Sequence, residues 1–173
     1  MGLARMKMLM GRAVGRTMVA LAFAPVAALA QTPGSRAPER PARMPYGLSI
    51  SLAEAKQVAA AAETAAIKAK VNVAIAVTDT SGELVYFEQL DDTSTGIREL
   101  ALQKARFSAR FRMPTSYVGE MKKAGNDSFL AFPGAFPGPG GITLTLNGKT
   151  VGALGVSGGA DGEVAVAGAA ALR

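Results

Sequence analysis

Residues 155–159 (GVSGG) have the spacing G-x-S-x-G, in which many serine hydrolases place their nucleophile. A serine hydroxyl attacks a carbonyl only when a base removes its proton, and in this motif the base is a histidine. The chain of 173 residues contains no histidine and no cysteine, and no serine has a lysine three residues later. We therefore exclude a Ser-His-Asp hydrolase, assign no catalytic residue, and interpret the glycines around Ser157 as a tight passage from a strand to a helix.

Residues 148–150 (GKT) end like the phosphate-binding loop of nucleotide hydrolases. However, Thr143 stands where that motif requires its first glycine. The lysine also follows a predicted hairpin turn instead of opening a helix. We therefore expect no nucleotide cofactor.

Two acidic pairs, Asp91 with Asp92 and Asp161 with Glu163, offer oxygen ligands for a hard cation. Adjacent residues of a strand point in opposite directions. Positions two apart on a helix do not share a face either. We interpret these pairs as a turn and a helix-terminal charge bias, so the sequence assigns no metal site.

The first thirty residues have the anatomy of a secretory signal peptide. Four basic residues come first, an apolar run covers residues 17–27, and Ala28 to Ala30 form a small-residue cleavage signal. The apolar run is shorter than the roughly 20 residues that cross a bilayer. We expect an exported protein, periplasmic or secreted, cleaved near Ala30 and without a membrane span in the mature chain; the alternative is a short N-terminal anchor.

The mature part is close to neutral. The whole chain carries a net charge of +6, and removal of the four basic leader residues leaves +2. This balance, without aromatic residues interleaved among basic ones, gives no reason to expect a nucleic-acid partner. Residues 31–46 are rich in proline and arginine and predict a disordered linker, which leaves one domain at residues 47–173.

The domain sequence predicts helices that alternate with hairpins. Ser51 and Glu54 form a capping box at the start of a small-sided helix that ends near residue 70. Further elements are expected as strands at 71–78 and 83–89, helices at 95–112 and 116–123, strands at 142–146 and 150–156, and a helix at 161–172. Because each strand pair is joined by a turn, we expect an α/β (α+β) fold with one antiparallel sheet.

The segment between residues 125 and 141 is a long loop of Gly, Pro and Phe, and such loops in compact domains are usually functional or disordered. Its phenylalanines are expected to line a ligand pocket or a subunit interface: Phe129, Phe132 and Phe136. The preceding helix carries Arg106 and Arg110. They are interpreted either as a solvated face or as partners of an acidic ligand or a neighbouring subunit.

Three C-terminal stretches carry a family pattern: residues 140–142 (GGI), residues 147–148 (NG) and residues 151–159 (VGALGVSGG) ahead of an acidic helix start. With the capping box, residues 77–82, and Lys104-Ala105 followed by Pro114-Thr115, they resemble the GlcG/HbpS-like haem-binding family. That family includes the C-terminal domain of PduO-type proteins. The resemblance covers roughly residues 47–172.

The resemblance implies a profilin-like three-layer arrangement around a five-stranded antiparallel sheet. It also implies homo-oligomers, from dimers up to hexamers or octamers, and a haem or related tetrapyrrole ligand. By the same resemblance, Thr115 occupies the position near which a threonine contact to haem has been proposed. Met113 and Tyr117 are chemically stronger iron ligands.

Two departures from the family pattern bear on the ligand. Residues 88–92 (EQLDD) replace the Arg-Met-Asp-Gly of many relatives, so acids stand in place of a cation. Histidine, the iron ligand of some haem-binding relatives, is absent.

Three functions remain open on the sequence. The first is an exported oligomeric protein that binds haem or a related tetrapyrrole. The second is a binding protein or enzyme for a small organic acid, and the third is a structural assembly protein. In either ligand-binding case, the backbone at Ser157 offers N–H groups to an anion at a helix N-terminus.

Overall fold

The computed structural model describes residues 37–172, so the expected signal peptide lies outside the described residues. The elements are α1 (Leu52–Ala69), β1 (Ala74–Thr78), β2 (Leu84–Gln89), α2 (Thr95–Phe111), α3 (Thr115–Lys123), the 3-10 helix η1 (Asp127–Ala131), β3 (Gly141–Leu146), β4 (Lys149–Ser157) and α4 (Asp161–Ala170). All the expected helices and strands are present, with their ends displaced by up to three residues. Helix η1 is an addition inside the expected loop.

The sheet has four strands in the order β2-β1-β4-β3, and every neighbouring pair is antiparallel. The expectation of five strands is therefore wrong. An extended segment does reach β4, where Tyr46 forms an isolated parallel bridge with Thr150. Pro45 has no N–H to donate, and the chain leaves β4 after Ile50 to begin α1, so the contact stays a bridge and does not become a strand.

Local signals account for the ends of several elements. The Ser51 hydroxyl accepts from the Glu54 N–H, and the Glu54 carboxylate accepts from the Ser51 N–H at 2.8 Å, which confirms the capping box. Asn147 and Gly148 both have positive φ, at 50° and 70°, as a tight β3–β4 hairpin turn requires. The register places Leu146 opposite Lys149 across this turn.

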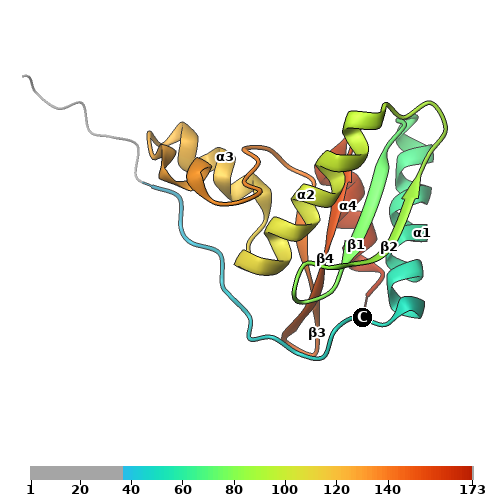
Figure 1. Ribbon diagram of the computed structural model, residues 1–173, viewed down its shortest axis with the longest axis horizontal. Coiled ribbons are helices and arrows are strands. Elements are labelled where there is room, and N and C mark those ends of the chain that lie inside the picture. The colour runs from blue at the N-terminus through green and yellow to red at the C-terminus, as the bar shows by residue number, and fades with distance from the viewer. Residues whose placement is uncertain (1–36, 173) are drawn as a thin grey trace, which may run out of the picture. The chain divides into compact units, whose positions relative to one another are not determined.

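The helices cover the two faces of the sheet unequally (Figure 1). Helices α1 and α4 pack together on one face, and α2 crosses the other. The main core lies on the α1/α4 side, where Ile75, Val77, Leu154 and Val156 meet the alanine-rich face of α1. Leu52 does not share in this packing and is 52% exposed, because it is the first residue of α1 and precedes the packed turns.

Helix α2 rests directly on the opposite face. Ala76 pairs with Gly155, and Gly155 pairs with Gly141, so one row without bulky side chains crosses three strands. A Cβ atom at Gly155 would lie 2.0 Å from the Ala101 carbonyl oxygen of α2. Gly155, the first glycine of the G-x-S-x-G stretch, therefore has an architectural role, which is to let α2 approach the sheet.

Helix α3 and η1 lie beyond the C-terminal end of α2, away from the sheet (Figure 1). In residues 37–172, no helix is both long enough and apolar enough to span a membrane. Part of the expected linker has contacts with the domain, since the Tyr46 hydroxyl donates to the Ala109 and Arg110 carbonyls at 3.0 Å.

Candidate functional site

A pocket of about 410 Å³ lies along α2 and the loop that follows η1. We call it the arginine pocket. Its lining residues are Glu99, Leu102, Gln103, Arg106, Phe107, Arg110, Pro133 and Gly134. The pocket combines two cations with an apolar wall, and its volume falls in the range typical of small-molecule sites.

The turn between β1 and β2 anchors both arginines. Arg106 Nε donates to the Gly82 carbonyl at 3.3 Å, and Arg110 Nε donates to the Ser81 carbonyl at 2.8 Å. Arg110 Nη2 also forms an exposed ion pair with Glu83 Oε1 at 3.1 Å. A Cβ atom at Gly82 would lie 2.8 Å from Arg110 Nε, and its φ of 86° favours glycine as well.

The anchoring turn is itself held by Asp79. Its carboxylate Oδ1 accepts from the Ser81 and Glu83 N–H groups, both at 2.8 Å. This is the turn role that carboxylates adopt in such loops. The residue therefore acts on the site through the turn and does not contact the pocket.

Each guanidinium keeps hydrogen-bond donors for a ligand. Arginine has five N–H donors. Within the described residues, Arg106 uses only Nε, and the Nη1 of Arg110 has no partner. Two arginines one helical turn apart with spare terminal N–H groups are suited to bind carboxylates.

Aromatic side chains from α2, α3 and the following loop form a separate cluster beside this pocket. The Phe107 ring is 4.8 Å from Phe111, which is 5.0 Å from Phe132, and Phe129 lies 5.2 Å from Phe132. Tyr117 meets Phe129 edge-on at 5.5 Å. Phe129 and Phe132 thus pack the loop onto α2 and do not line the arginine pocket, which only Phe107 reaches.

The three iron-ligand candidates lie inside the protein. Met113 and Tyr117 belong to the aromatic cluster and are 1% and 5% exposed. Thr115 is fully buried, and its hydroxyl accepts from the Gly141 N–H at 3.0 Å. Met113 and Tyr117 therefore act as packing residues, and Thr115 connects the start of α3 to β3.

A second polar cluster surrounds Lys104, which sequence reasoning did not select. The Nζ atom of this fully buried side chain donates to Asp161 Oδ2 at 2.6 Å, to the Val156 carbonyl at 3.1 Å and to Ser157 Oγ at 3.3 Å. It also lies 4.5 Å from the centre of the Phe136 ring. The signal in the sequence was the position of this lysine among the apolar residues of α2, which indicates a buried side chain.

This cluster does not activate Ser157. All three ammonium N–H bonds are directed at partners, so Lys104 is a donor to the serine and not a base. Burial lowers the pKa of Lys104, while the hydrogen bond and charge of Asp161 oppose that change. Ser157 is itself 1% exposed, so the arrangement is a structural lock between α2 and the β4–α4 turn.

A hollow of about 620 Å³ opens next to this lock and is lined by residues 157–163 with Ile97, Leu100 and Pro139. Asp161 and Glu163 already place two carboxylates in the first turn of α4. Asp161 Oδ1 also accepts from the Gly159 N–H at 2.8 Å. The protein's own acids thus place negative charge at the helix N-terminus, which disfavours the anion contact expected at Ser157.

Another hollow, of about 440 Å³, has an acidic lining that includes Glu63, Glu88, Asp91 and Asp92. Burial, with the nearby charge of Glu63, raises the pKa of Glu88, although the Tyr86 hydroxyl bonded to it acts in the opposite direction. In the part of the chain that the structure describes, no three acidic, cysteine or histidine side chains are grouped to hold a metal ion. The acids that replace the family's cation therefore make this end unsuitable for anions.

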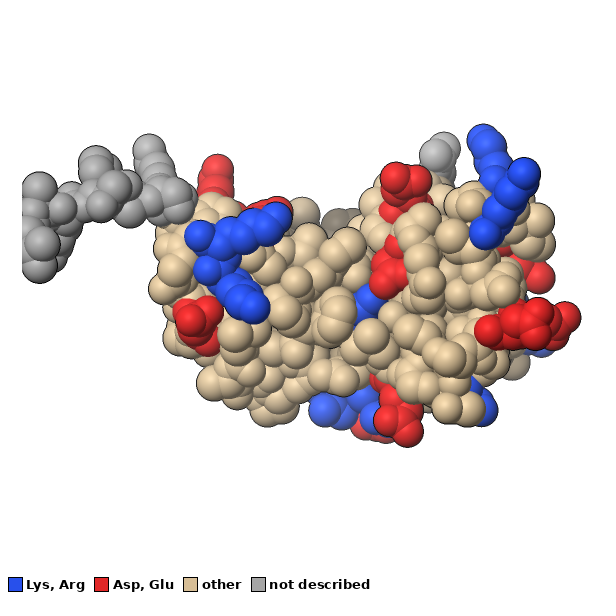
Figure 2. Space-filling view, turned by 90° about the horizontal axis from the view of Figure 1, so that it is seen from above, with Lys and Arg blue, Asp and Glu red and all other residues tan. Residues whose placement is uncertain are grey.

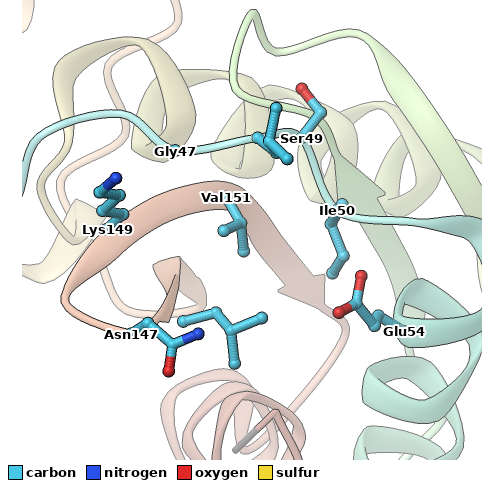
Figure 3. A pocket seen from close by; sticks show the side chains of 9 residues that line it. Gly47, Ser49, Ile50, Glu54, Asn147, Lys149 and Val151 are labelled. Carbon is cyan, nitrogen blue, oxygen red and sulfur yellow. The ribbon is translucent and has the colours of Figure 1, made fainter.

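A further pocket, of about 340 Å³, lies between the start of α1 and the β3–β4 hairpin (Figure 3). Ile50 and Val151 form its apolar part, while Glu54 and Lys149 come from opposite sides. On the face shown in Figure 2, the basic side chains stand in several separate groups, each with acidic side chains nearby, and they do not form one basic patch.

The comparisons with known proteins agree with this fold. A family model described as haem degrading protein HbpS-like matches residues 50–171. Protein GlcG of Escherichia coli K12 is 35% identical over 108 residues, which cover 62% of this chain and 81% of GlcG. A 15.0 kDa protein from the dhaT-dhaS intergenic region of Citrobacter freundii is 31% identical over 120 residues, 64% of this chain and 81% of that protein.

Solved structures show the same fold. A double mutant of HbpS from Streptomyces reticuli is 28% identical, with a TM-score of 0.67 over 79% of this chain and 95% of its own. A complex of PduOC with haem also has a TM-score of 0.67, over 73% of this chain and 96% of its own, at 23% identity. The family model matches well over half of the residues of this chain, so the chain belongs to the HbpS-like family.

Proposed function

We propose that this protein binds haem or a related tetrapyrrole in the arginine pocket. The observation that carries the proposal is the pair Arg106 and Arg110, fixed by the β1–β2 turn with spare N–H donors beside Leu102, Phe107 and Pro133. A tetrapyrrole has an apolar ring with carboxylate side chains. Its carboxylates suit the arginines, and an edge of the ring suits the apolar wall.

The family supports this ligand class. The matching family model is named for haem degradation, and one solved relative is a complex with haem. Arg106 and Arg110, both on α2, are the proposed partners of the ligand's carboxylates. The protein is therefore proposed as a binding protein first, with no catalytic residue assigned.

The direct test is titration of the purified protein with hemin, followed by the Soret band. We expect a saturable shift with a defined stoichiometry. A linear, unsaturable change would contradict the proposal. Bovine serum albumin would be an unsuitable reference because it binds hemin, so lysozyme serves as the negative control.

A small organic acid is the second candidate, because the same two arginines suit any carboxylate. Competition separates the two ligands. If millimolar dicarboxylates raise the melting temperature saturably and hemin does not, the organic-acid function replaces the tetrapyrrole.

We also propose that the mature protein is exported. The basic leader, the apolar run and the A-x-A signal before Gln31 support export. N-terminal sequencing of protein from the periplasm or medium should begin at or near Gln31. An uncleaved N-terminus in the cytoplasm would contradict this proposal.

Finally, we propose a homo-oligomer whose contact includes Leu48. This leucine is 91% exposed next to the apolar pocket of Figure 3. It is held outward because the Gly47 and Ile50 N–H groups are bonded to the Thr150 and Val151 carbonyls of β4, both at 2.8 Å.

A second copy of the chain is the occupant that this surface suits. A two-fold contact needs one patch that is complementary to itself. Here an exposed leucine stands beside an apolar hollow, and Glu54 and Lys149 flank the hollow. Neither residue makes an ion pair within residues 37–172. Glu54 Oε2 is engaged in the capping box, so the Glu54 Oε1 atom and the Lys149 ammonium are the groups proposed to pair with the opposite charges of a second copy.

A further inference from the structure

We infer that the protein recognises the ring and carboxylates of its tetrapyrrole and does not coordinate the central metal. The inference rests on the proposed tetrapyrrole function. It concerns which part of the ligand provides the affinity. It follows from the donor chemistry of the pocket and from the places that the structure gives to the other donors.

The arginine pocket offers no side chain that haem proteins use as an axial ligand. Haem iron is held by histidine, cysteine, methionine or tyrosine, and none of these is among the lining residues. The lining has one carboxylate, on the exposed side chain of Glu99. Arginine stays protonated and cannot donate a lone pair.

The sulfur and phenol donors of the aromatic cluster are buried. Met44 and Tyr46 are half-exposed but do not line the pocket, and the Tyr46 hydroxyl already donates to the Ala109 and Arg110 carbonyls. Phe107 belongs to the same cluster as Met113 and Tyr117, but of these three side chains it alone is among the lining residues. Met113 and Tyr117 are 1% and 5% exposed. An iron atom would reach them only if the packing of this cluster were disrupted.

The remaining candidates are already occupied. The Thr115 hydroxyl is buried and accepts from the Gly141 N–H. Lys104 donates all three N–H bonds within its own cluster. Both would lose established hydrogen bonds on turning to a metal, and buried polar groups left unpaired cost about 1–3 kcal/mol each.

The test compares three ligands with the purified protein by fluorescence quenching and absorption titration. Hemin and iron-free protoporphyrin IX should bind with dissociation constants within about threefold of each other. Protoporphyrin dimethyl ester, which has lost both carboxylates, should bind roughly tenfold more weakly or worse.

Two conservative variants guard against a hidden ligand. Met113→Leu and Tyr117→Phe preserve the packing volume while removing sulfur and hydroxyl. The Soret maximum of bound hemin should stay unchanged in both. A changed spectrum in either variant, hemin that binds more than about threefold tighter than the iron-free ring, or a dimethyl ester that binds as tightly as hemin would overturn the inference. If none of the three ligands binds, the proposed function fails first.

Discussion

Lys104 Nζ lies 2.6 Å from Asp161 Oδ2, although the two residues are 57 positions apart in the chain. The lysine comes from the middle of α2, and the aspartate is the first residue of α4. Their contact joins α2, on one face of the sheet, to the turn between β4 and α4. Because Lys104 is fully buried, this pair is part of the core and not of the surface.

Replacing Lys104 by alanine should lower the free energy of unfolding by about 3 kcal/mol, because a carboxylate with little exposure then loses its partner. Urea denaturation monitored by circular dichroism measures this change. The matched control is Glu83→Gln, which removes the exposed partner of Arg110 and should cost less than about 1 kcal/mol. Equal losses in the two variants would show that burial of the lysine pair has no special effect.

Gly155→Ala should destabilise the fold by about 3 kcal/mol, since the new methyl would overlap the Ala101 carbonyl. The control is Gly96→Ala near the start of α2, where nothing lies within 4 Å. That change should stabilise the protein by about 0.5–1 kcal/mol. If Gly155→Ala unfolds at the wild-type urea concentration, the glycine is not required for the approach of α2.

Glu88→Gln should stabilise the protein at neutral pH. Burial raises the pKa of the Glu88 carboxyl, so the folded protein keeps this proton where the unfolded chain has released it. The stability from Glu88 is therefore present below the ordinary glutamate pKa and is lost as pH rises through the folded value. The melting temperatures of Glu88→Gln and of wild type should be nearly equal below about pH 4, and the variant should melt increasingly above wild type as the pH rises. A constant difference at all pH values would contradict the assignment.

Leu48→Asp should convert the oligomer to smaller species, because it places a charge in the proposed apolar contact. Sedimentation velocity should show a dissociation constant that rises by roughly tenfold or more. Leu84→Asp is the control, since Leu84 is another exposed leucine on β2, at 46%. If Leu84→Asp dissociates the oligomer and Leu48→Asp does not, the contact lies elsewhere; a monomeric wild type would remove the oligomer itself.

The fold was largely predictable from local signals. The capping box and the Asn147-Gly148 turn each act through neighbouring backbone atoms, so a single stretch of sequence contains the whole cause. The number of strands was not predictable in this way. Whether residues near Tyr46 form a fifth strand depends on where β4 ends in space and on a proline that cannot donate.

The candidate site was predicted less well, for a physical reason. Arg106 and Arg110 were selected, but their anchors on Ser81 and Gly82 are long-range contacts. Met113, Thr115 and Tyr117 were selected by donor chemistry alone, which says nothing of burial. Lys104 was passed over because its partner Asp161 lies far along the chain, and only the tertiary structure brings the two together.

Titration with hemin of the double variant Arg106→Gln/Arg110→Gln, beside wild type and Arg98→Gln, tests the central claim most directly. Arg98 belongs to the same helix but lies over Phe87, outside the arginine pocket, so its variant controls for the loss of one of the two positive charges on α2. We predict that the double variant weakens hemin binding by roughly tenfold or more, while Arg98→Gln binds as wild type. Equal affinity of all three proteins would contradict a ligand site built on the arginine pocket.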